Sequence, residues 1–378
     1  MSSVIVLKTR EHEVEKNVNK IFELAGGINK FVKKGDRVLI KPNFLNSKPS
    51  STGCTTDLRI VEAVVRLVLK QKAVPIIGEG APISFDTEQS YKRLGVKKLA
   101  ERYKVRLVDL NKYAFKKVKL KNALVLNEAR ISKLVFEVDK IINLPVMKTH
   151  VLTTVSLGMK NMMGCLSGDE KIELHRRGIC EGIVDLCRIK KPDFTIIDGI
   201  VAMEGAGPTN GKPKKMNLLI GSEDVLAADI IASSIMGFNP YSLKFIRLAQ
   251  GKGIGEHDIK RLRVIGARLK DVRRKFSFPL VNIRKLLGTV LLKRIIPVLK
   301  GMGVDINEFA RQVYEALRPY PVFLEHCKQC KRCVINCPEK ALVLQGTNKP
   351  LLHKKKCIKC YVCDEVCLYG AVKIKGSR

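Results

Sequence analysis

Eight of the twelve cysteines in this 378-residue chain lie between positions 327 and 367. They form two copies of one pattern, CKQCKRCVINCP at 327–338 and CIKCYVCDEVCL at 357–368. Each cysteine of the second copy lies 30 positions after its counterpart, since 357 − 327 = 30 and the other pairs give the same offset. A short β-like segment, ALVL or AVKI, follows each copy. The end of the chain is therefore an internal repeat of one small cysteine-rich unit.

The spacing of these cysteines distinguishes between two kinds of metal site. A zinc site uses two CxxC pairs and gives no role to the third cysteine of a CxxCxxC run. Three thiolates separated by two residues, with a fourth from elsewhere, suit the corners of a [4Fe–4S] cubane. The run Cys-x2-Cys-x2-Cys-x3-Cys-Pro is the bacterial ferredoxin pattern, in which the fourth cysteine serves the other cluster. The whole segment resembles a two-cluster bacterial-type ferredoxin.

This resemblance implies two [4Fe–4S] clusters whose ligand sets cross between the copies. The implied ligands are Cys327, Cys330, Cys333 and Cys367 for the first cluster, and Cys357, Cys360, Cys363 and Cys337 for the second. In one departure from the pattern, Leu368 occupies the position that Pro338 holds in the first copy. Because proline fixes the backbone as it leaves the cluster, we expect Cys367 to be held less rigidly, with ligation retained.

Basic residues accompany the cysteines throughout this segment. They are Lys328, Lys331, Arg332, Lys354, Lys355, Lys356 and Lys359. A cubane with four thiolates carries a charge of about −2 when oxidised and about −3 when reduced, so nearby cations favour reduction. The same cations predict an acidic electron carrier of the ferredoxin or flavodoxin type, or a redox enzyme, as the partner.

Composition limits the remaining choices. Apolar residues make up 46% of the chain, enough for one large core or two smaller ones. No uncharged apolar run approaches the roughly 18 residues of a membrane span, and the apolar run near the N-terminus is too short for a secretory signal. We therefore expect a cytoplasmic protein, in which clustered cysteines act as metal ligands. The net charge of +34 also suits nucleic acid, but it is spread along the chain and no recognition motif accompanies it.

Short apolar runs alternate with amphipathic segments upstream of the cysteines. Strands are predicted at 4–7, 37–42, 74–78, 105–109, 138–144, 193–198, 216–221 and 263–266, and helices near 11–25, 57–71 and 92–102. This alternation predicts an α/β domain with a mixed or mostly parallel sheet and helices on both faces. We expect that domain at 1–267, a helical connector at 268–320, and a small α+β ferredoxin-like domain with two clusters at 321–378.

Three longer segments of the α/β region resemble a known family. They are INLPVMKTHVLTTVSLGMKNMMG, DLCRIKKPDFTIIDGIVAMEGAGPTNG and GSEDVLAADIIASSIMGFNP. They resemble the family named domain of unknown function 362, whose members often carry a C-terminal two-cluster ferredoxin segment. The similarity covers most of residues 35–266 and implies no particular reaction. The motif residues of the family correspond here to Lys41, Asn43, Lys148, His150, Lys160, Asn161, His175, Asp198, Glu204 and Asp229.

The types of these residues suggest two kinds of site. Lys148 and Lys160, with Asn161 beside them, predict the binding of an anionic small molecule such as a phosphate or carboxylate. His150 and His175, with Asp198 and Glu204, suit a divalent metal or acid–base chemistry, the alternative being hydrogen bonds to neighbouring loops. The candidate catalytic residues are thus Lys148, His150, Lys160 and Glu204, and the candidate cofactor-binding residues are Lys41, Asn43, Asn161, Gly205 and Gly207.

These observations favour two functions. The first is an iron–sulfur protein that passes single electrons through two [4Fe–4S] clusters to a partner or substrate at the α/β domain. The second is a ferredoxin-fed reductase, an oxidoreductase acting on an anionic small molecule near Lys148, His150 and Lys160. A nucleic-acid-binding iron–sulfur protein is a third and less favoured alternative. Glycines 205 and 207 belong to a predicted loop that is either a lid, a backbone segment near a ligand, or a long surface turn.

Overall fold

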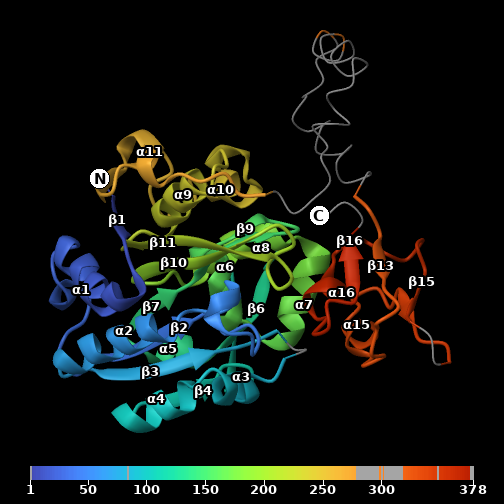
Figure 1. Ribbon diagram of the computed structural model, residues 1–378, viewed down its shortest axis with the longest axis horizontal. Helices are drawn as coiled ribbons and strands as arrows, with labels where there is room; N and C mark the ends of the chain where they lie inside the picture. Colours follow the sequence, from blue (N-terminus) through green and yellow to red (C-terminus); the bar gives the residue numbers. More distant parts are fainter. Residues whose placement is uncertain are drawn as a thin grey trace. The chain divides into compact units, whose positions relative to one another are not determined.

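A computed structural model describes residues 2–82, 85–277, 298, 301, 318–346 and 349–374. The chain divides into two compact units, Met1–Ser277 and Phe278–Arg378. The larger unit holds a ten-stranded mixed sheet with helices on both faces, which confirms the predicted α/β fold class (Figure 1). Most of the predicted helical connector, including 278–297 and 302–317, lies outside the described residues.

Eight strands follow one another across the sheet in the order β12, β1, β11, β10, β7, β2, β3, β4. Neighbouring strands from β10 to β4 run parallel, whereas β11 is antiparallel to both β1 and β10. Off this path, β8 pairs with β10 and β9. The strand bounds are β1 Ser3–Lys8, β2 Arg37–Pro42, β3 Val74–Glu79, β4 Arg106–Asp109, β7 Lys140–Leu144, β8 Val146–His150, β9 Thr154–Ser156, β10 Phe194–Glu204, β11 Lys212–Ser222 and β12 Arg263–Gly266.

Helices cover the two faces because side chains alternate along each strand. On β1, Val4 and Val6 join one apolar cluster and Ile5 joins the other. Helices α1, α2 and α4 pack in the cluster of Ile5, and α5, α8, α9 and α10 pack in the cluster of Val4. The helix bounds are α1 Val14–Leu24, α2 Leu58–Lys70, α3 Thr87–Arg93, α4 Val96–Tyr103, α5 Leu134–Glu137, α6 Gly158–Asn161, α7 Gly168–Arg177, α8 Ile179–Ile189, α9 Val225–Ile235, α10 Lys244–Ala249 and α11 Leu269–Val272.

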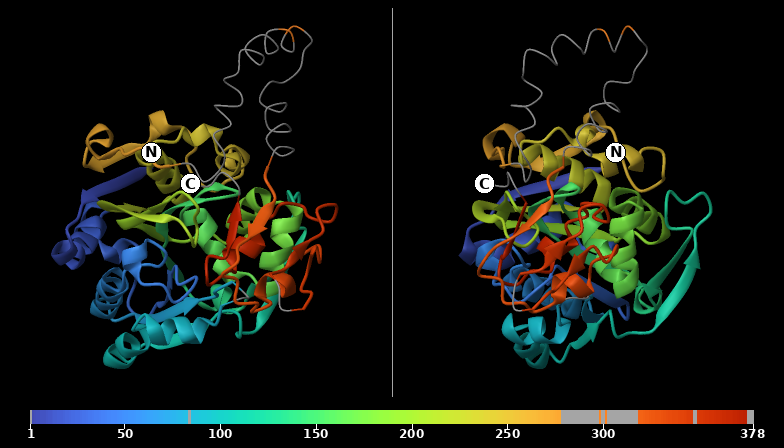
Figure 2. Two further views of the ribbon diagram at one scale, coloured as in Figure 1. Left: turned by 45° about the vertical axis from the view of Figure 1, so that its right-hand side comes forward. Right: turned by 90° about the vertical axis from the view of Figure 1, so that its right-hand side faces the viewer.

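Several elements of this unit were not predicted. Strands β5 Phe115–Lys119 and β6 Glu128–Ser132 form a separate two-stranded sheet (Figure 2). Strand β8 escaped prediction because its five residues, VMKTH, are all buried, so that no apolar–polar alternation marks it. The glycine-rich segment predicted as one loop is shorter than expected, since β10 continues to Glu204 and β11 begins at Lys212.

The described part of the smaller unit repeats one arrangement. Its helices α15 and α16 begin 30 residues apart, as the cysteines do. Strand β13 pairs antiparallel with β16, and β14 with β15, so each two-stranded sheet joins a strand before one cysteine motif to a strand after the other. The bounds are β13 Pro321–Phe323, α15 Arg332–Ile335, β14 Leu342–Val343, β15 Leu351–Leu352, α16 Val362–Glu365 and β16 Val372–Ile374.

Candidate metal centres and the buried polar cluster

The backbones of the two cysteine motifs follow the same path. Positive φ angles occur at equivalent positions, at Gln329 and Lys331 in the first motif and Lys359 and Tyr361 in the second, and at Lys340 and Gly370 two residues after each motif. The left-handed conformation is uncommon for residues other than glycine. Its recurrence at three matched positions shows that both segments make the same tight turns, two between their cysteines and one after the last cysteine.

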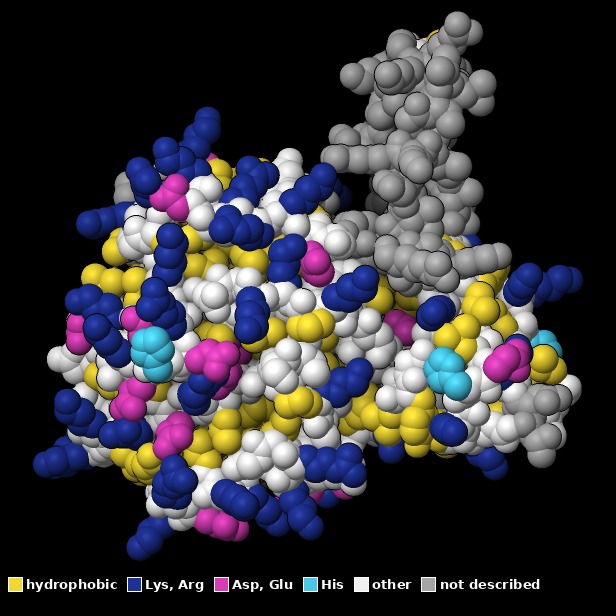
Figure 3. Space-filling view, viewed as in Figure 1, with side chains coloured by type: hydrophobic (Ala, Val, Ile, Leu, Met, Phe, Trp, Pro, Cys, Tyr) yellow, Lys and Arg dark blue, Asp and Glu magenta, His cyan; other side chains and the backbone are white. Residues whose placement is uncertain are grey.

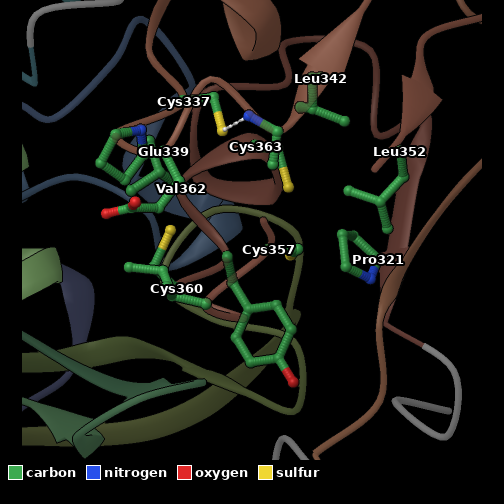
Figure 4. Close-up of a pocket in the computed structure, with 13 residues that line it drawn as sticks. Pro321, Cys337, Glu339, Leu342, Leu352, Cys357, Cys360, Val362 and Cys363 are labelled. Atoms are coloured by element: carbon green, nitrogen blue, oxygen red, sulfur yellow. Dashed lines mark hydrogen bonds between the residues drawn. The ribbon is translucent and has the colours of Figure 1, made fainter. Parts of the chain in front are cut away.

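Each motif contributes to two cavities. The first cysteine site, defined by Cys327, Cys330, Cys333 and Cys367, combines three cysteines of the first motif with the fourth of the second. The second cysteine site, defined by Cys337, Cys357, Cys360 and Cys363, has the reverse composition (Figure 4). The cavity at each site has a volume of about 20 Å³. The structure thus brings together the two crossed sets of four cysteines that the sequence implied.

Backbone N–H groups donate to the sulfurs of these sites. The N–H of Ala341 donates to Cys337 Sγ at 3.2 Å, which is the dashed line in Figure 4, and the N–H of Ala371 donates to Cys367 Sγ at 3.2 Å. Such hydrogen bonds stabilise sulfur ligands that carry negative charge. Sets of four soft sulfur donors with N–H groups directed at them fit iron–sulfur clusters.

Burial and the charges of neighbouring cysteines favour the protonated thiol at one cysteine of each site, Cys333 and Cys360. Burial, followed by the charges of Cys327, Cys330 and Cys367, raises the pKa of Cys333 to about 12. Burial also raises the pKa of Cys360 to about 12, with Cys337 among the contributing neighbours. Thiols must be deprotonated to bind a metal, so metal binding by Cys333 and Cys360 would release protons.

A buried ion pair joins the carboxyl ends of two central strands in the larger unit. Lys41 Nζ on β2 lies 2.7 Å from Glu79 Oε1 on β3, and both side chains are buried. Glu79 also accepts hydrogen bonds from the backbone N–H groups of Phe44 and Gly80 at 3.0 and 2.8 Å. A side chain at Gly164 would collide with both charged groups. The absence of a side chain at Gly164 therefore leaves room for the buried pair.

An amide network extends from this pair. Lys148 Nζ donates to Asn43 Oδ1 at 2.7 Å, Asn43 Nδ2 donates to Asn161 Oδ1 at 2.8 Å, and Asn161 Nδ2 donates to Asn143 Oδ1 at 2.8 Å. Asn143 on β7 lies opposite Lys41 on β2 in the sheet register. The chain leaves β2 toward β3 on one side and returns to β7 on the other, which is the switch point where α/β sheets bind ligands. Four predicted residues, Lys41, Asn43, Lys148 and Asn161, thus lie together.

The other predicted residues lie in different surroundings. His150 on β8 accepts hydrogen bonds at Nδ1 from the N–H groups of Leu152 and Thr153, at 3.1 and 3.3 Å. Lys160 lies on α6. Glu204, at the end of β10, pairs with Lys214 at 2.8 Å and accepts from the N–H of Ser277 at 2.9 Å.

The two predicted glycines, Gly205 and Gly207, lie in the loop between β10 and β11. Gly205 has a φ of +81° and open space around its Cα. Gly207 lies against β8, where a side chain would collide with the carbonyl oxygen of Thr149. The N–H of Val151 donates to the Gly207 carbonyl at 3.3 Å. Gly207 therefore allows the loop backbone to pack closely against strand β8.

The acids and histidines proposed as metal ligands bond to separate parts of the backbone. Asp198 accepts from the N–H groups of Asp57 and Ile200, and Asp229 accepts from those of Gly158 and Met159. Burial raises the pKa of both carboxyls to about 7. His175 Nδ1 lies 2.7 Å from the carbonyl oxygen of Lys171. Within the described ranges, the two cysteine sites included, no three His, Cys, Asp or Glu side chains are placed to hold a single metal ion. The thiolates of a four-iron cluster each bind a different iron, so they are farther apart than the ligands of one ion.

Three residues of the polar cluster were not predicted. Glu79 completes the pair and follows the apolar run of β3, which is the signal that marks a strand end. Asn143 completes the network from inside the apolar run of β7, where no such signal marks it. Lys171 on α7 donates to the carbonyl of Gly80 at 2.8 Å and to Asn111 Oδ1 at 2.6 Å. Burial lowers the pKa of Lys171 to about 8. Its neighbours in GDEKIELHRR are charged, so the sequence indicates an exposed helix there.

The fold and these sites define a protein of two parts. One is an α/β unit with a buried lysine–asparagine cluster at its switch point, and the other is a small unit in which two cysteine motifs share two cavities. The family model described as "Domain of unknown function (DUF362)" matches residues 38–234. The chain belongs to this family.

Two curated proteins and one solved structure are similar to the chain. A thylakoid-associated protein of Synechocystis sp. is 30% identical over 265 residues, which are 67% of this chain and 80% of that protein. An uncharacterized ferredoxin of Methanocaldococcus jannaschii is 37% identical over 51 residues, 13% of this chain and 82% of that protein. The lactate racemase apoprotein of Thermoanaerobacterium thermosaccharolyticum matches with a TM-score of 0.41 and 14% identity, covering 62% of this chain and 57% of its own. In the described part of the chain, no helix combines the length and apolarity needed to cross a bilayer.

Proposed function

We propose that this chain is an iron–sulfur electron-transfer protein that works in a reducing compartment such as the cytoplasm. Cys327, Cys330, Cys333 and Cys367 hold one [4Fe–4S] cluster, and Cys337, Cys357, Cys360 and Cys363 hold the other. Such clusters supply one-electron transfer when bound. The single observation that carries the proposal is the pair of cavities, each lined by four cysteines taken three and one from the two motifs.

The residues of the smaller unit have distinct tasks in this proposal. The thiolates ligate iron, and the N–H groups of Ala341 and Ala371 stabilise the charge on the fourth sulfur of each motif. The similarity of the segment to a ferredoxin over 51 residues supports the same assignment. The partner is a small acidic electron carrier or a redox enzyme, and electrons leave toward a partner or substrate at the α/β unit.

The test is anaerobic reconstitution of the full chain with iron and sulfide. We expect about eight irons per chain and, after dithionite reduction, an EPR spectrum of two interacting reduced clusters. A variant in which Cys54 and Cys165 are replaced by alanine is the matched control, because these buried cysteines lie in the larger unit. Its iron content should equal that of the natural chain. A colourless, iron-free product would refute the proposal.

A second candidate function is a reductase that draws electrons from these clusters. The buried cluster of Lys41, Asn43, Lys148 and Asn161 at the switch point favours it, because ammonium and amide groups there suit an anionic small molecule. His150, two residues after Lys148 on β8, would then be the acid–base group.

Binding measurements on the full chain test this second candidate. We expect a carboxylate or phosphate probe to bind to the natural protein and to bind at least about tenfold more weakly to Lys148→Met, a loss of about 1.4 kcal/mol. Lys48→Met is the control, because Lys48 donates to the carbonyl of Thr209, outside the network. Iron content should stay constant in both variants. Equal binding by all three proteins would argue against a substrate site at Lys148.

A further inference from the structure

The two cysteine sites differ in the charge of their linings. Lys328, Lys331 and Arg332 line the first site. Among the described residues lining the second site, the charged one is Glu339, and most of the others are apolar, such as Leu342 and Ile358. The linings thus differ in charge, although Lys359, which does not line the second site, acts electrostatically on Cys357 of that site. The two sites are therefore electrostatically unequal, although their cysteine patterns are the same.

The sites also differ in their access to solvent. All eight cysteines of the motifs lie in the described residues, and Cys330 of the first site is the exposed one. The cysteines of the second site are partly or fully buried. Electron transfer between proteins requires the two redox centres to approach closely. A partner protein can therefore come closer to the first site, which has the exposed cysteine, than to the second site.

Exposed apolar side chains lie beside the first site. Tyr369, which lines that site, is 48% exposed, and the adjacent Leu368 is 37% exposed. Leu368 occupies the position at which the first motif has Pro338. Aromatic and apolar groups surrounded by basic residues form the kind of surface that protein partners bind.

We propose that a small acidic one-electron carrier of the ferredoxin type docks over Cys330 and delivers its electron to the first cysteine site. The docking surface consists of Lys328, Lys331, Arg332, Leu368 and Tyr369. In this step the carrier's centre is oxidised by one electron and the cluster at the first site is reduced by one, with no bond made or broken. This proposal rests on the proposed function, because it requires clusters at the cysteine sites.

Charge complementarity selects this partner. The carboxylates of an acidic carrier would be attracted to the three cations around Cys330. Other cations of the segment are placed differently: the ammonium groups of Lys354 and Lys359 lie over the ring of Tyr320, at 5.8 and 4.7 Å from its centre. Lys355 and Lys356 are exposed and line neither cysteine site, which makes them suitable controls.

The test compares two double variants of the reconstituted full chain, Lys328→Gln/Lys331→Gln and Lys355→Gln/Lys356→Gln. Each removes two exposed positive charges, so each changes the net charge equally. Stopped-flow spectroscopy would follow electron transfer from a reduced acidic ferredoxin at several ionic strengths. We expect the first variant to react about tenfold more slowly at low salt and to lose much of its salt dependence. The control should differ from the natural chain by less than about twofold.

Crosslinking adds a measurement that does not depend on the rate. A carbodiimide joins carrier carboxylates to lysines that they contact, and mass spectrometry identifies those lysines. We expect crosslinks at Lys328 or Lys331 rather than at Lys355 or Lys356. Equal slowing of both variants, or crosslinks centred on Lys355 and Lys356, would overturn the proposed docking site. Iron counting before the kinetics separates this failure from a failure of the proposed function, in which no cluster would form.

Discussion

At the scale of single residues, the Lys41–Glu79 pair is the most demanding feature of the larger unit. Its two charges are buried, and removing ions from water costs several kcal/mol per ion even after the protein relaxes. Replacing such a pair by apolar residues is often neutral for stability, so stability alone gives no reason to keep it. Its place at the carboxyl ends of β2 and β3, beside the amide network, favours a role in ligand binding.

The cost of breaking this pair can be measured. Glu79→Gln leaves the Lys41 ammonium buried without its carboxylate, and we expect the free energy of unfolding to fall by about 3–5 kcal/mol. Urea denaturation at fixed pH and salt measures this change. The double variant Lys41→Met/Glu79→Gln removes both charges and should lose less than the single one. A single variant as stable as the natural chain would contradict the buried charge on Lys41.

Asp229 predicts a pH dependence of stability. Its pKa rises from about 3.9 in an unfolded chain to about 7 in the folded protein, because burial outweighs the hydrogen bonds from Met159 and Gly158. The folded state binds the extra proton between these values, so the free energy of unfolding falls as the pH rises from about 4 to about 7. Asp229→Asn cannot ionise and should escape this loss.

Urea denaturation of both proteins across that pH range is the measurement. The stability difference should move in favour of Asp229→Asn as the pH rises, and then level off above about pH 7. Asp169→Asn, at a side chain that is 73% exposed, controls for the change from acid to amide. A difference that stays constant from pH 4 to pH 7 would be inconsistent with the raised pKa of Asp229.

At the scale of elements, the loop between β10 and β11 shows how a close contact restricts a residue. Gly207→Ala would drive a methyl group into the Thr149 carbonyl on β8, and we expect it to cost about 3 kcal/mol. Gly205→Ala meets no neighbouring atoms and should cost only the strain of its positive φ, about 1 kcal/mol. Urea denaturation of the two variants measures this order, and the reverse order would contradict the packing of the loop on β8.

The crossing of the cysteine motifs predicts how single substitutions act. In Cys367→Ser the first site loses a ligand supplied by the second motif, so Cys327, Cys330 and Cys333 should become open to alkylation. In Cys337→Ser the reverse set, Cys357, Cys360 and Cys363, should react. Mass spectrometry locates the alkylated residues, and iron content should fall from about eight to about four in each variant. Alkylation within the substituted motif would indicate that the ligand sets do not cross.

Prediction from sequence worked where local pattern decides the structure. The strands at 37–42 and 74–78 have apolar runs between polar ends, and both form, because such runs need only a sheet to bury them. Strand β8 and Lys171 were missed for the opposite reason, since their polar side chains are buried by contacts with distant segments. Among the predicted site residues, Lys148 and Asn43 meet although 105 positions separate them. Glu204 instead pairs with Lys214 across its own hairpin, which residue type alone does not reveal.

At the scale of the whole molecule, the net charge of +34 is the dominant property. On the face drawn in Figure 3, Lys and Arg side chains are spread over the view rather than gathered in one stripe. A compact state with this charge repels itself, and salt screens that repulsion. We therefore expect the melting temperature to rise as NaCl increases from about 20 to about 200 mM, the range over which the Debye length falls from about 20 to about 7 Å. Calorimetry in sodium chloride tests this, and a falling melting temperature would show that favourable ion pairs outweigh the repulsion.

The exchange of the fourth sulfur between the motifs has a consequence for the ancestry of this segment. A peptide with a single thirty-residue copy would carry three ligands of one site and the fourth ligand of another. Such a peptide could complete neither site alone. Two such peptides, associated as a homodimer, would complete both sites. Duplication and fusion of the gene would place both copies in one chain. Mutation of a cysteine in either copy would then remove a ligand from one of the two sites.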